Sequence, residues 1–222
     1  RLVGRITVDD ILDVAQEEAD EDIAQITGTP DLADENDSFS HIVRLRLPWL
    51  FVTMFLALGN SFVINQLMPE SSVLINSTVM AAFIPVIMAM SGNTGMQSST
   101  IIIRELALGN IKDDELFKIA FKEMKLGATM GLACGLLGGL ATWGILQLSQ
   151  QHDLKISLLV GISIFHAMTF SSFFSSMVPI TLNKMNLDPA VSAGPFVTTL
   201  NDIFASVIYF MTFNILLYYH WS

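Results

Sequence analysis

Five long apolar segments constrain the fold of this 222-residue chain more than any other feature. A transmembrane helix needs about 20 consecutive, mostly apolar residues, with a range of roughly 17–25. The five segments reach that length and lie at residues 47–68, 73–90, 126–148, 156–178 and 196–219. Only 14% of the residues are charged, against about 25% in soluble domains. The sequence therefore predicts an all-α integral membrane protein with about five transmembrane helices.

The acidic charge of the chain is confined to its N-terminal part. Residues 1–40 hold 12 Asp and Glu against two Arg. In the rest of the chain the acidic and basic residues are equal in number, so the net charge of −10 comes from residues 1–40. Apolar residues recur at helical spacing over residues 8–26, and Thr7 followed by Asp10 resembles a capping box. We predict an acidic amphipathic helix that ends near Gly28 and Pro30 and precedes the first span.

Several function classes are excluded by what the sequence lacks. No basic stripe of the kind that binds nucleic acid is present. Cys134 is the only cysteine, so neither an internal disulfide nor a cysteine-based zinc site is expected. Metalloprotease and serine-hydrolase motifs are absent as well. We therefore expect a protein that is not an enzyme.

The positions of Lys and Arg predict the orientation in the membrane. Arg44 and Arg46 precede the first span, and Lys184 lies between the fourth and fifth. The connection between the second and third spans holds Arg104, Lys112, Lys118, Lys122 and Lys125. Because positive residues accumulate on the cytoplasmic side, the N-terminus is expected in the cytoplasm and the C-terminus outside.

Asp202 is the most informative polar residue, because it lies inside the last apolar segment. A carboxylate at membrane depth costs roughly 2.5–3.5 kcal/mol on insertion scales and usually marks an ion pathway. Thr198, Thr199 and Ser206 lie one turn away on the same helix, so hydroxyl oxygens surround it. Hard oxygen ligands suit Mg²⁺, Ca²⁺ or Mn²⁺. The alternative is an Asp paired with a distant cation or protonated in the bundle.

A second polar segment, SGNTGMQSST at residues 91–100, follows the second apolar run. It contains Asn93, Gly95 and Gln97 among small residues. We interpret it as a break in the helix, since irregular backbone at membrane depth is tolerated where it lines a cavity. The other interpretation is a turn at the membrane surface.

Asp188 lies just before the last span, together with Pro189. A carboxylate near a helix start is favourable for the helix dipole, so a structural role explains it. A role at the mouth of a pore is the second interpretation.

With these residues in view, the chain resembles the MgtE family of bacterial Mg²⁺ channels and transporters. Two motifs carry the resemblance: GNTGMQSS at residues 92–99 and DPAVSAGPFVTTLNDIFA at residues 188–205. The opening GRITVDDILDV is similar to the end of a CBS domain, the regulatory module of this family. The resemblance implies three parts, namely a CBS-like tail at 1–7, an acidic connecting or plug helix with its linker at 8–46, and an ion-conducting domain at 47–222. It also implies the bacterial inner membrane, and N-terminal regulatory domains that act as a partner.

The resemblance also implies a homodimer with a pore at its two-fold axis. The last-helix aspartate, here Asp202, faces that axis from both subunits and holds a largely hydrated Mg²⁺. Thr198 and Gly194 lie one and two turns before it, and Asp188 matches an acidic position near the cytoplasmic mouth. The remaining pore wall is expected from Asn93, Gly95, Gln97 and Thr199.

The acidic helix has an implied role in regulation. In the family, Mg²⁺ bridges acids of the regulatory domains and of this helix when cytoplasmic Mg²⁺ is high. The candidate ligands are Glu17, Glu18, Asp20, Glu21 and Asp22. A divalent cation relieves the repulsion between clustered carboxylates and so favours a compact state. The alternative is a solvated acidic helix.

The expected function is therefore Mg²⁺ transport through a pore that crosses membrane lipid. A cation-coupled Mg²⁺ exchanger and a non-conducting Mg²⁺ sensor are the alternatives. Selectivity among Mg²⁺, Mn²⁺, Co²⁺ and Ca²⁺ stays open at this point.

Overall fold

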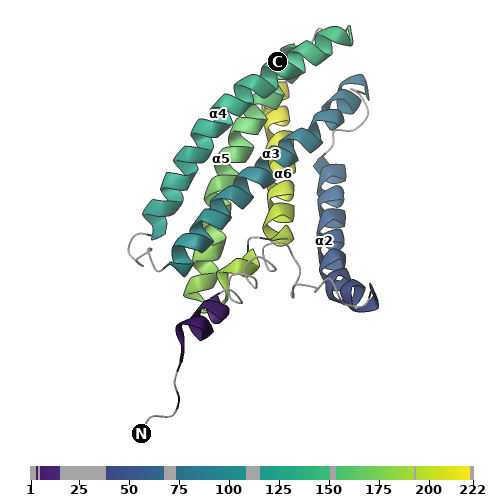
Figure 1. The fold of residues 1–222 in the computed structure, drawn as a ribbon. Coiled ribbons are helices and arrows are strands. Elements are labelled where there is room, and N and C mark those ends of the chain that lie inside the picture. The colour runs from purple at the N-terminus through teal and green to yellow at the C-terminus, as the bar shows by residue number, and fades with distance from the viewer. Residues whose placement is uncertain are drawn as a thin grey trace.

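The computed structural model describes residues 4, 6–15, 39–67, 74–108, 116–150, 154–192 and 194–220. Within these ranges the chain forms helices and no strand, so the predicted all-α class is confirmed there. The elements are a helix over residues 8–15, α2 (Phe39–Leu67), α3 (Leu74–Ala107), α4 (Leu116–Leu148), α5 (Leu154–Lys184), the 3-10 helix η1 (Pro189–Ser192) and α6 (Pro195–His220) (Figure 1).

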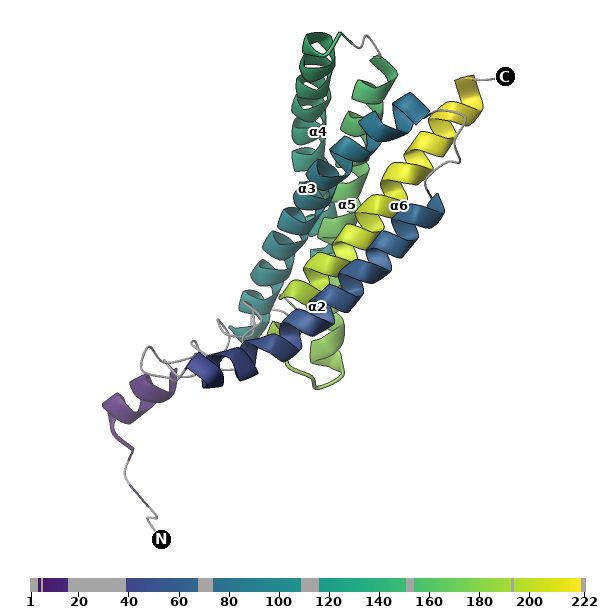
Figure 2. The same ribbon diagram turned by 90° about the vertical axis from the view of Figure 1, so that its right-hand side faces the viewer.

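The long helices form a bundle in which successive helices run in alternate directions (Figure 1). Helix α5 is central and packs against α3, α4 and α6, while α3 also packs against α6. Helix α2 lies beside α6, as Figure 2 shows. This order brings α3 and α6, which carry the two motifs of interest, into direct contact.

The core of the bundle is formed mainly by α3, α5 and α6. Ile87, Val160, Tyr209 and Phe210 are almost completely buried in one cluster, together with Phe213. Many large apolar side chains on the outside of the bundle are exposed instead, including Leu136 and Leu140 on α4. Apolar residues on both the inside and the outside are expected of helices that are surrounded by lipid.

Three helices are long and apolar enough to cross a membrane, judged over the described residues. Their qualifying stretches are Leu50–Leu67, Leu116–Leu148 and Leu154–Lys184. They coincide with the first, third and fourth predicted spans. Helices α3 and α6 contain the second and fifth predicted spans, but each also carries polar residues in its middle.

The helices extend well beyond the predicted spans. Helix α2 begins at Phe39, within the segment assigned to the linker, and α4 begins at Leu116, before the predicted residue 126. Hydropathy identifies the part of a helix that suits lipid, whereas the backbone hydrogen-bond ladder continues into more polar sequence. The predicted boundaries are therefore those of apolar segments and not of helices.

The predicted break at residues 91–100 is wrong. Helix α3 is continuous from Leu74 to Ala107 and includes the whole SGNTGMQSST segment. A glycine in a helix interior costs about 1 kcal/mol relative to alanine, and that cost is offset when neighbouring helices pack against the position it leaves open. Gly92 and Gly95 therefore act as contact positions for neighbouring helices.

Glycines also determine the contact between α4 and α5. A Cβ atom on Gly135 would lie 2.5 Å from the carbonyl oxygen of Gly161, and one on Gly161 would lie 2.7 Å from the carbonyl oxygen of Gly135. A Cβ atom on Gly139 would likewise lie 3.1 Å from the carbonyl oxygen of Ser157. The small residues at these positions therefore allow α4 and α5 to approach closely, as is common between helices in lipid.

The N-terminal helix over residues 8–15 begins with the predicted capping box. The Asp10 carboxylate accepts hydrogen bonds from the Thr7 N at 2.7 Å and the Thr7 Oγ1 at 2.6 Å. The Asp10 N donates to the Thr7 Oγ1 at 3.3 Å in return. The remainder of the predicted acidic helix, residues 16–26, lies outside the described residues.

The capping box predicts a pH effect at Asp10. The hydrogen bond from the Thr7 hydroxyl, followed by that from the Thr7 backbone, lowers the pKa of Asp10 below 3.8. Because the folded-state pKa is lowered, the stabilising contribution is present above the ordinary pKa and lost as pH falls through the lowered value. Thr7→Val should raise the pKa of Asp10 towards 3.8, measured by NMR titration of its carboxyl carbon. An unchanged pKa would contradict the role of the hydroxyl.

Candidate cation site

A cavity of about 360 Å³ lies between α3 and α6 and contains Asp202. Helix α3 contributes Pro85, Met88, Ala89, Gly92 and Asn93, and α6 contributes Thr198 and Asp202. These positions recur every three or four residues, so each helix presents one face to the cavity. The continuous α3 is what places Gly92 and Asn93 on the same face as Pro85.

Gly92 allows the two helices to approach at the level of Asp202. A Cβ atom on Gly92 would lie 3.2 Å from the Thr198 Cγ2 and 3.7 Å from the Asp202 Oδ1. A larger side chain at this position would therefore project towards the carboxylate. The missing side chain leaves room beside Asp202 for water or an ion.

The Asp202 carboxylate is half-buried. Among the described residues, no side chain or backbone group donates a hydrogen bond to it and no cation pairs with it. A carboxylate at membrane depth without a protein partner is expensive and by default indicates a functional site. Asp202 is therefore a candidate for binding a cation from outside the chain.

Three of the residues predicted from the sequence meet on this cavity: Asp202, Thr198 and Asn93. The Thr198 Oγ1 is buried and has no hydrogen-bond partner among the described residues. Asn93 is exposed, one residue beyond Gly92. The Thr198 hydroxyl is therefore not open to the cavity, whereas Asp202 and Asn93 offer carboxylate and amide oxygens, which are ligand types that hard divalent cations prefer.

Three other candidates for the pore wall are not among the residues that line the cavity. Gly95 is buried against α5 and α6 and faces Asn201 and two serines. Thr199 is 8% exposed. Gln97 is exposed on α3.

The two candidates that precede α6 have local structural roles. The Asp188 side chain is exposed, and its Oδ1 accepts a hydrogen bond from the Ala190 N at 2.9 Å, next to η1. Gly194 is buried, and its carbonyl oxygen accepts from the Val197 N at 3.2 Å and the Thr198 N at 3.5 Å. These bonds satisfy backbone groups where α6 begins.

Clusters of metal-binding side chains are not found in the described part of the chain. No group of three or more His, Cys, Asp and Glu there lies close enough to hold a metal ion. The acidic candidates Glu17, Glu18, Asp20, Glu21 and Asp22 lie outside the described residues. A cation at Asp202 would accordingly keep most of its water, as Mg²⁺ commonly does in proteins.

Sequence reasoning missed several residues of this region. Pro85, Met88 and Ala89 line the cavity, and their spacing to Gly92 is helical. That periodicity was a usable signal, but it requires α3 to continue through residue 92.

Asn60 was also missed: it is the one buried residue within 50–67 of α2, and its Nδ2 lies 3.9 Å from the sulfur of Met88. A polar residue in an apolar span was the available signal.

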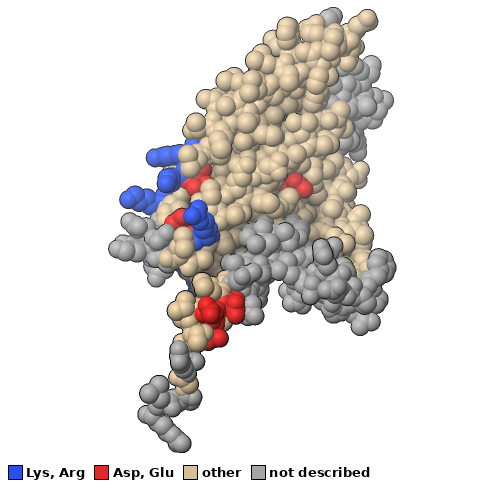
Figure 3. All heavy atoms as spheres, in the orientation of Figure 1, with Lys and Arg blue, Asp and Glu red and all other residues tan. Residues whose placement is uncertain are grey.

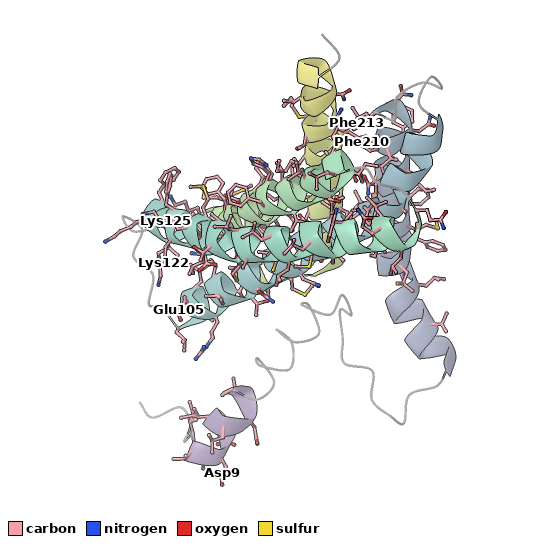
Figure 4. All side chains as sticks on the ribbon, turned by 90° about the horizontal axis from the view of Figure 1, so that it is seen from above. Asp9, Glu105, Lys122, Lys125, Phe210 and Phe213 are labelled. Carbon is pink, nitrogen blue, oxygen red and sulfur yellow. The ribbon has the colours of Figure 1, made fainter. Side chains whose placement is uncertain are left out.

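Most of the described basic side chains lie at one end of the bundle (Figure 3), whereas Lys155 lies at the other, in the first turn of α5. Arg104 is in the last turn of α3, Lys184 is in the last turn of α5, and α4 begins nearby with Lys118 and Lys122. Figure 4 shows Lys122 and Lys125 at the opposite end from Phe210 and Phe213. One end of the described bundle is thus rich in positive charge.

Comparisons with known proteins agree on one family. The model of the family MgtE, described as a divalent cation transporter, matches residues 84–212. A magnesium transporter MgtE of Enterococcus faecalis is 32% identical over 94% of this chain and 44% of its own length. Those of Bacillus subtilis, at 32% identity, and Thermus thermophilus, at 33%, are covered over 45% and 47% of their lengths. The chain thus spans just under half the length of these curated relatives.

Proposed function

Because the chain belongs to the MgtE family of divalent cation transporters, we propose that it carries Mg²⁺ across the membrane past Asp202. The observation that carries this proposal is the Asp202 carboxylate, which has no partner among the residues the structure describes and lines a cavity of about 360 Å³. The three similar transporters are named for magnesium. The motif residues Asn93, Thr198 and Asp202 line the same cavity.

The chemistry of the cavity suits a hydrated Mg²⁺. This ion prefers octahedral oxygen coordination and releases its waters reluctantly. Six waters occupy roughly 180 Å³ at their volume in the liquid, so the cavity between α3 and α6 has room for the ion with its shell. Asp202 attracts the cation, while the amide oxygen of the exposed Asn93 accepts hydrogen bonds from the coordinated waters.

The proposed transporter is a homodimer, in which each chain contributes one Asp202. One carboxylate compensates only half the charge of Mg²⁺, and no second acid is among the described residues that line the cavity. A symmetric partner would supply it, since a two-fold axis presents the same face of both copies. Rings of acidic side chains are a recognised device for selecting cations.

The proposed topology has five spans, formed by α2 to α6. Their alternating directions place the positively charged end of the bundle on one side of the membrane (Figure 3). That side is cytoplasmic by the positive-inside rule. The N-terminus then lies in the cytoplasm and the C-terminus outside, in a bacterial inner membrane. The relatives' additional length leaves room for the regulatory domains that the acidic segment would contact.

Uptake by liposomes tests the proposal. The protein is reconstituted with a Mg²⁺-sensitive dye inside, and uptake is recorded with identical Na⁺ and H⁺ concentrations on both sides. We expect uptake that follows the Mg²⁺ gradient alone. A dependence on a Na⁺ or H⁺ gradient would favour a coupled exchanger. Binding of Mg²⁺ without uptake would favour a sensor and contradict the proposal.

A further inference from the structure

A buried polar junction lies where α3, α5 and α6 meet, next to the proposed cation site. Its centre is Asn201, which is completely buried and directly precedes Asp202 in the sequence. The Asn201 Nδ2 donates a hydrogen bond of 2.8 Å to the Oγ of Ser175 on α5, and Ser175 is also completely buried. This bond links α6 to the central helix of the bundle.

Gly95 of α3 provides the space for this junction. A Cβ atom on Gly95 would lie 2.5 Å from the Oγ atoms of both Ser171 and Ser175, and it would also collide with the Asn201 Nδ2. Real Cβ atoms do not approach other atoms so closely, so a larger residue here would displace the side chains of the junction. Gly95 thus allows α3 to pack closely against α5 and α6 behind the cavity.

A second set of hydrogen bonds ties α3 into the same junction. The Ser171 Oγ donates to the carbonyl oxygen of Ser91 at 2.6 Å, and the Ser91 Oγ lies 3.4 Å from the carbonyl oxygen of Asn201. Ser91 directly precedes Gly92, which faces Asp202. Both helices that form the cavity are therefore fixed against α5 at the level of the carboxylate.

The presence of an amide at position 201 is costly. Its Oδ1 is buried without a hydrogen-bond partner among the described residues, and an unpaired polar atom in an apolar medium is destabilising. An apolar side chain would avoid this cost at a buried position. What Asn201 provides in return is the directional bond of its Nδ2 to Ser175.

We infer that Asn201 and Ser175 are positioning residues, which fix the rotation of α6 and so direct Asp202 into the cavity. Successive residues on an α-helix differ by about 100° in direction. When Asn201 is held against α5, Asp202 points past Gly92 into the space between α3 and α6. The inference rests on the proposed function in one respect, namely that Asp202 binds the transported cation.

Ser172, which lies on α5 like Ser175, provides a matched control. Ser172 is completely buried, like Ser175, and its Oγ accepts one interhelical hydrogen bond, of 3.1 Å, from the Ser98 Oγ of α3. That bond does not involve α6. Ser175→Ala and Ser172→Ala therefore remove the same atom at equally buried sites, but only Ser175→Ala releases Asn201.

The test measures Mg²⁺ uptake over a range of Mg²⁺ concentrations for both variants in liposomes. Ser175→Ala should raise the half-saturating Mg²⁺ concentration by about threefold to tenfold, the range expected when one hydrogen bond that fixes a binding group is lost. Ser172→Ala should leave that concentration unchanged. Asn201→Ala should raise it like Ser175→Ala, and the double variant should show no further increase, because both substitutions remove the same bond.

Three results would overturn the inference. Equal increases in the half-saturating Mg²⁺ concentration for Ser175→Ala and Ser172→Ala would show that buried hydroxyls act only through general packing. A lower maximal rate at an unchanged half-saturating concentration would show only a loss of folded protein. Fully additive shifts in the double variant would show that Asn201 and Ser175 act separately. Wild-type protein without Mg²⁺ uptake would instead contradict the proposed function, and the positioning role would fall with it.

Discussion

Asp202→Asn is expected to reduce Mg²⁺ uptake to the rate of liposomes without protein. The substitution keeps the size of the side chain but removes the charge that attracts a divalent cation into the cavity. Asparagine also replaces one acceptor oxygen by a donor group, which is unfavourable towards a positively charged ion. Thr198 and Asn93 remain, but neither carries charge.

The same substitution should leave the stability of the protein unchanged or increase it. Asp202 has no ion-pair partner among the described residues, and a charge at membrane depth costs roughly 2.5–3.5 kcal/mol on insertion scales. Loss of transport with retained or higher thermal stability is thus the expected combination. Asn214→Ala on the same helix, which removes only a local bond to the Phe210 carbonyl oxygen, serves as the control. Loss of folding in Asp202→Asn would contradict a functional role for the carboxylate.

Gly135→Ala is expected to destabilise the bundle strongly. The added Cβ would lie 2.5 Å from the carbonyl oxygen of Gly161, so backbone and not a flexible side chain must move. Overpacking of a tight contact typically costs about 1–3 kcal/mol. The loss should appear as a lower midpoint in thermal or detergent unfolding of the purified protein.

Gly144→Ala is the matched control for this packing effect. Gly144 lies on the same helix, and a Cβ there would meet nothing within 4 Å. Alanine is favoured over glycine in helices by about 1 kcal/mol, so this variant should be as stable as the wild type or more so. Similar destabilisation of both variants would contradict the close contact of α4 with α5.

The sequence was most informative where one physical property dominates. Lipid demands apolar helices, so the all-α class followed from five apolar segments, but their ends did not, since α2 and α4 continue into polar sequence. Asp202 was recognisable because a carboxylate in an apolar segment has few explanations. Both inferences need only the chain itself, without knowledge of what packs against it.

Other features depended on contacts between helices that no single segment reveals. The run at 91–100 was interpreted as a break because polar and small residues interrupt an apolar segment, yet packing against α5 and α6 accompanies a continuous α3. Asn201 resembles any polar residue until Ser175 and Gly95 are seen beside it. The metal ligands predicted at 17–22 fall outside the described residues and remain a prediction.

The most direct test of the central claim is whether the cavity beside Asp202 lies on the path of Mg²⁺. A cysteine at Thr198 is introduced after Cys134, the only cysteine of the chain, is replaced by serine. Mg²⁺ uptake is then measured before and after reaction with a positively charged, water-soluble thiol reagent, with a cysteine at the exposed Ser149, just after the end of α4, as the control. We predict that modification at position 198 stops uptake and that treatment of the control does not. Unchanged uptake after complete modification at position 198 would contradict transport through this cavity.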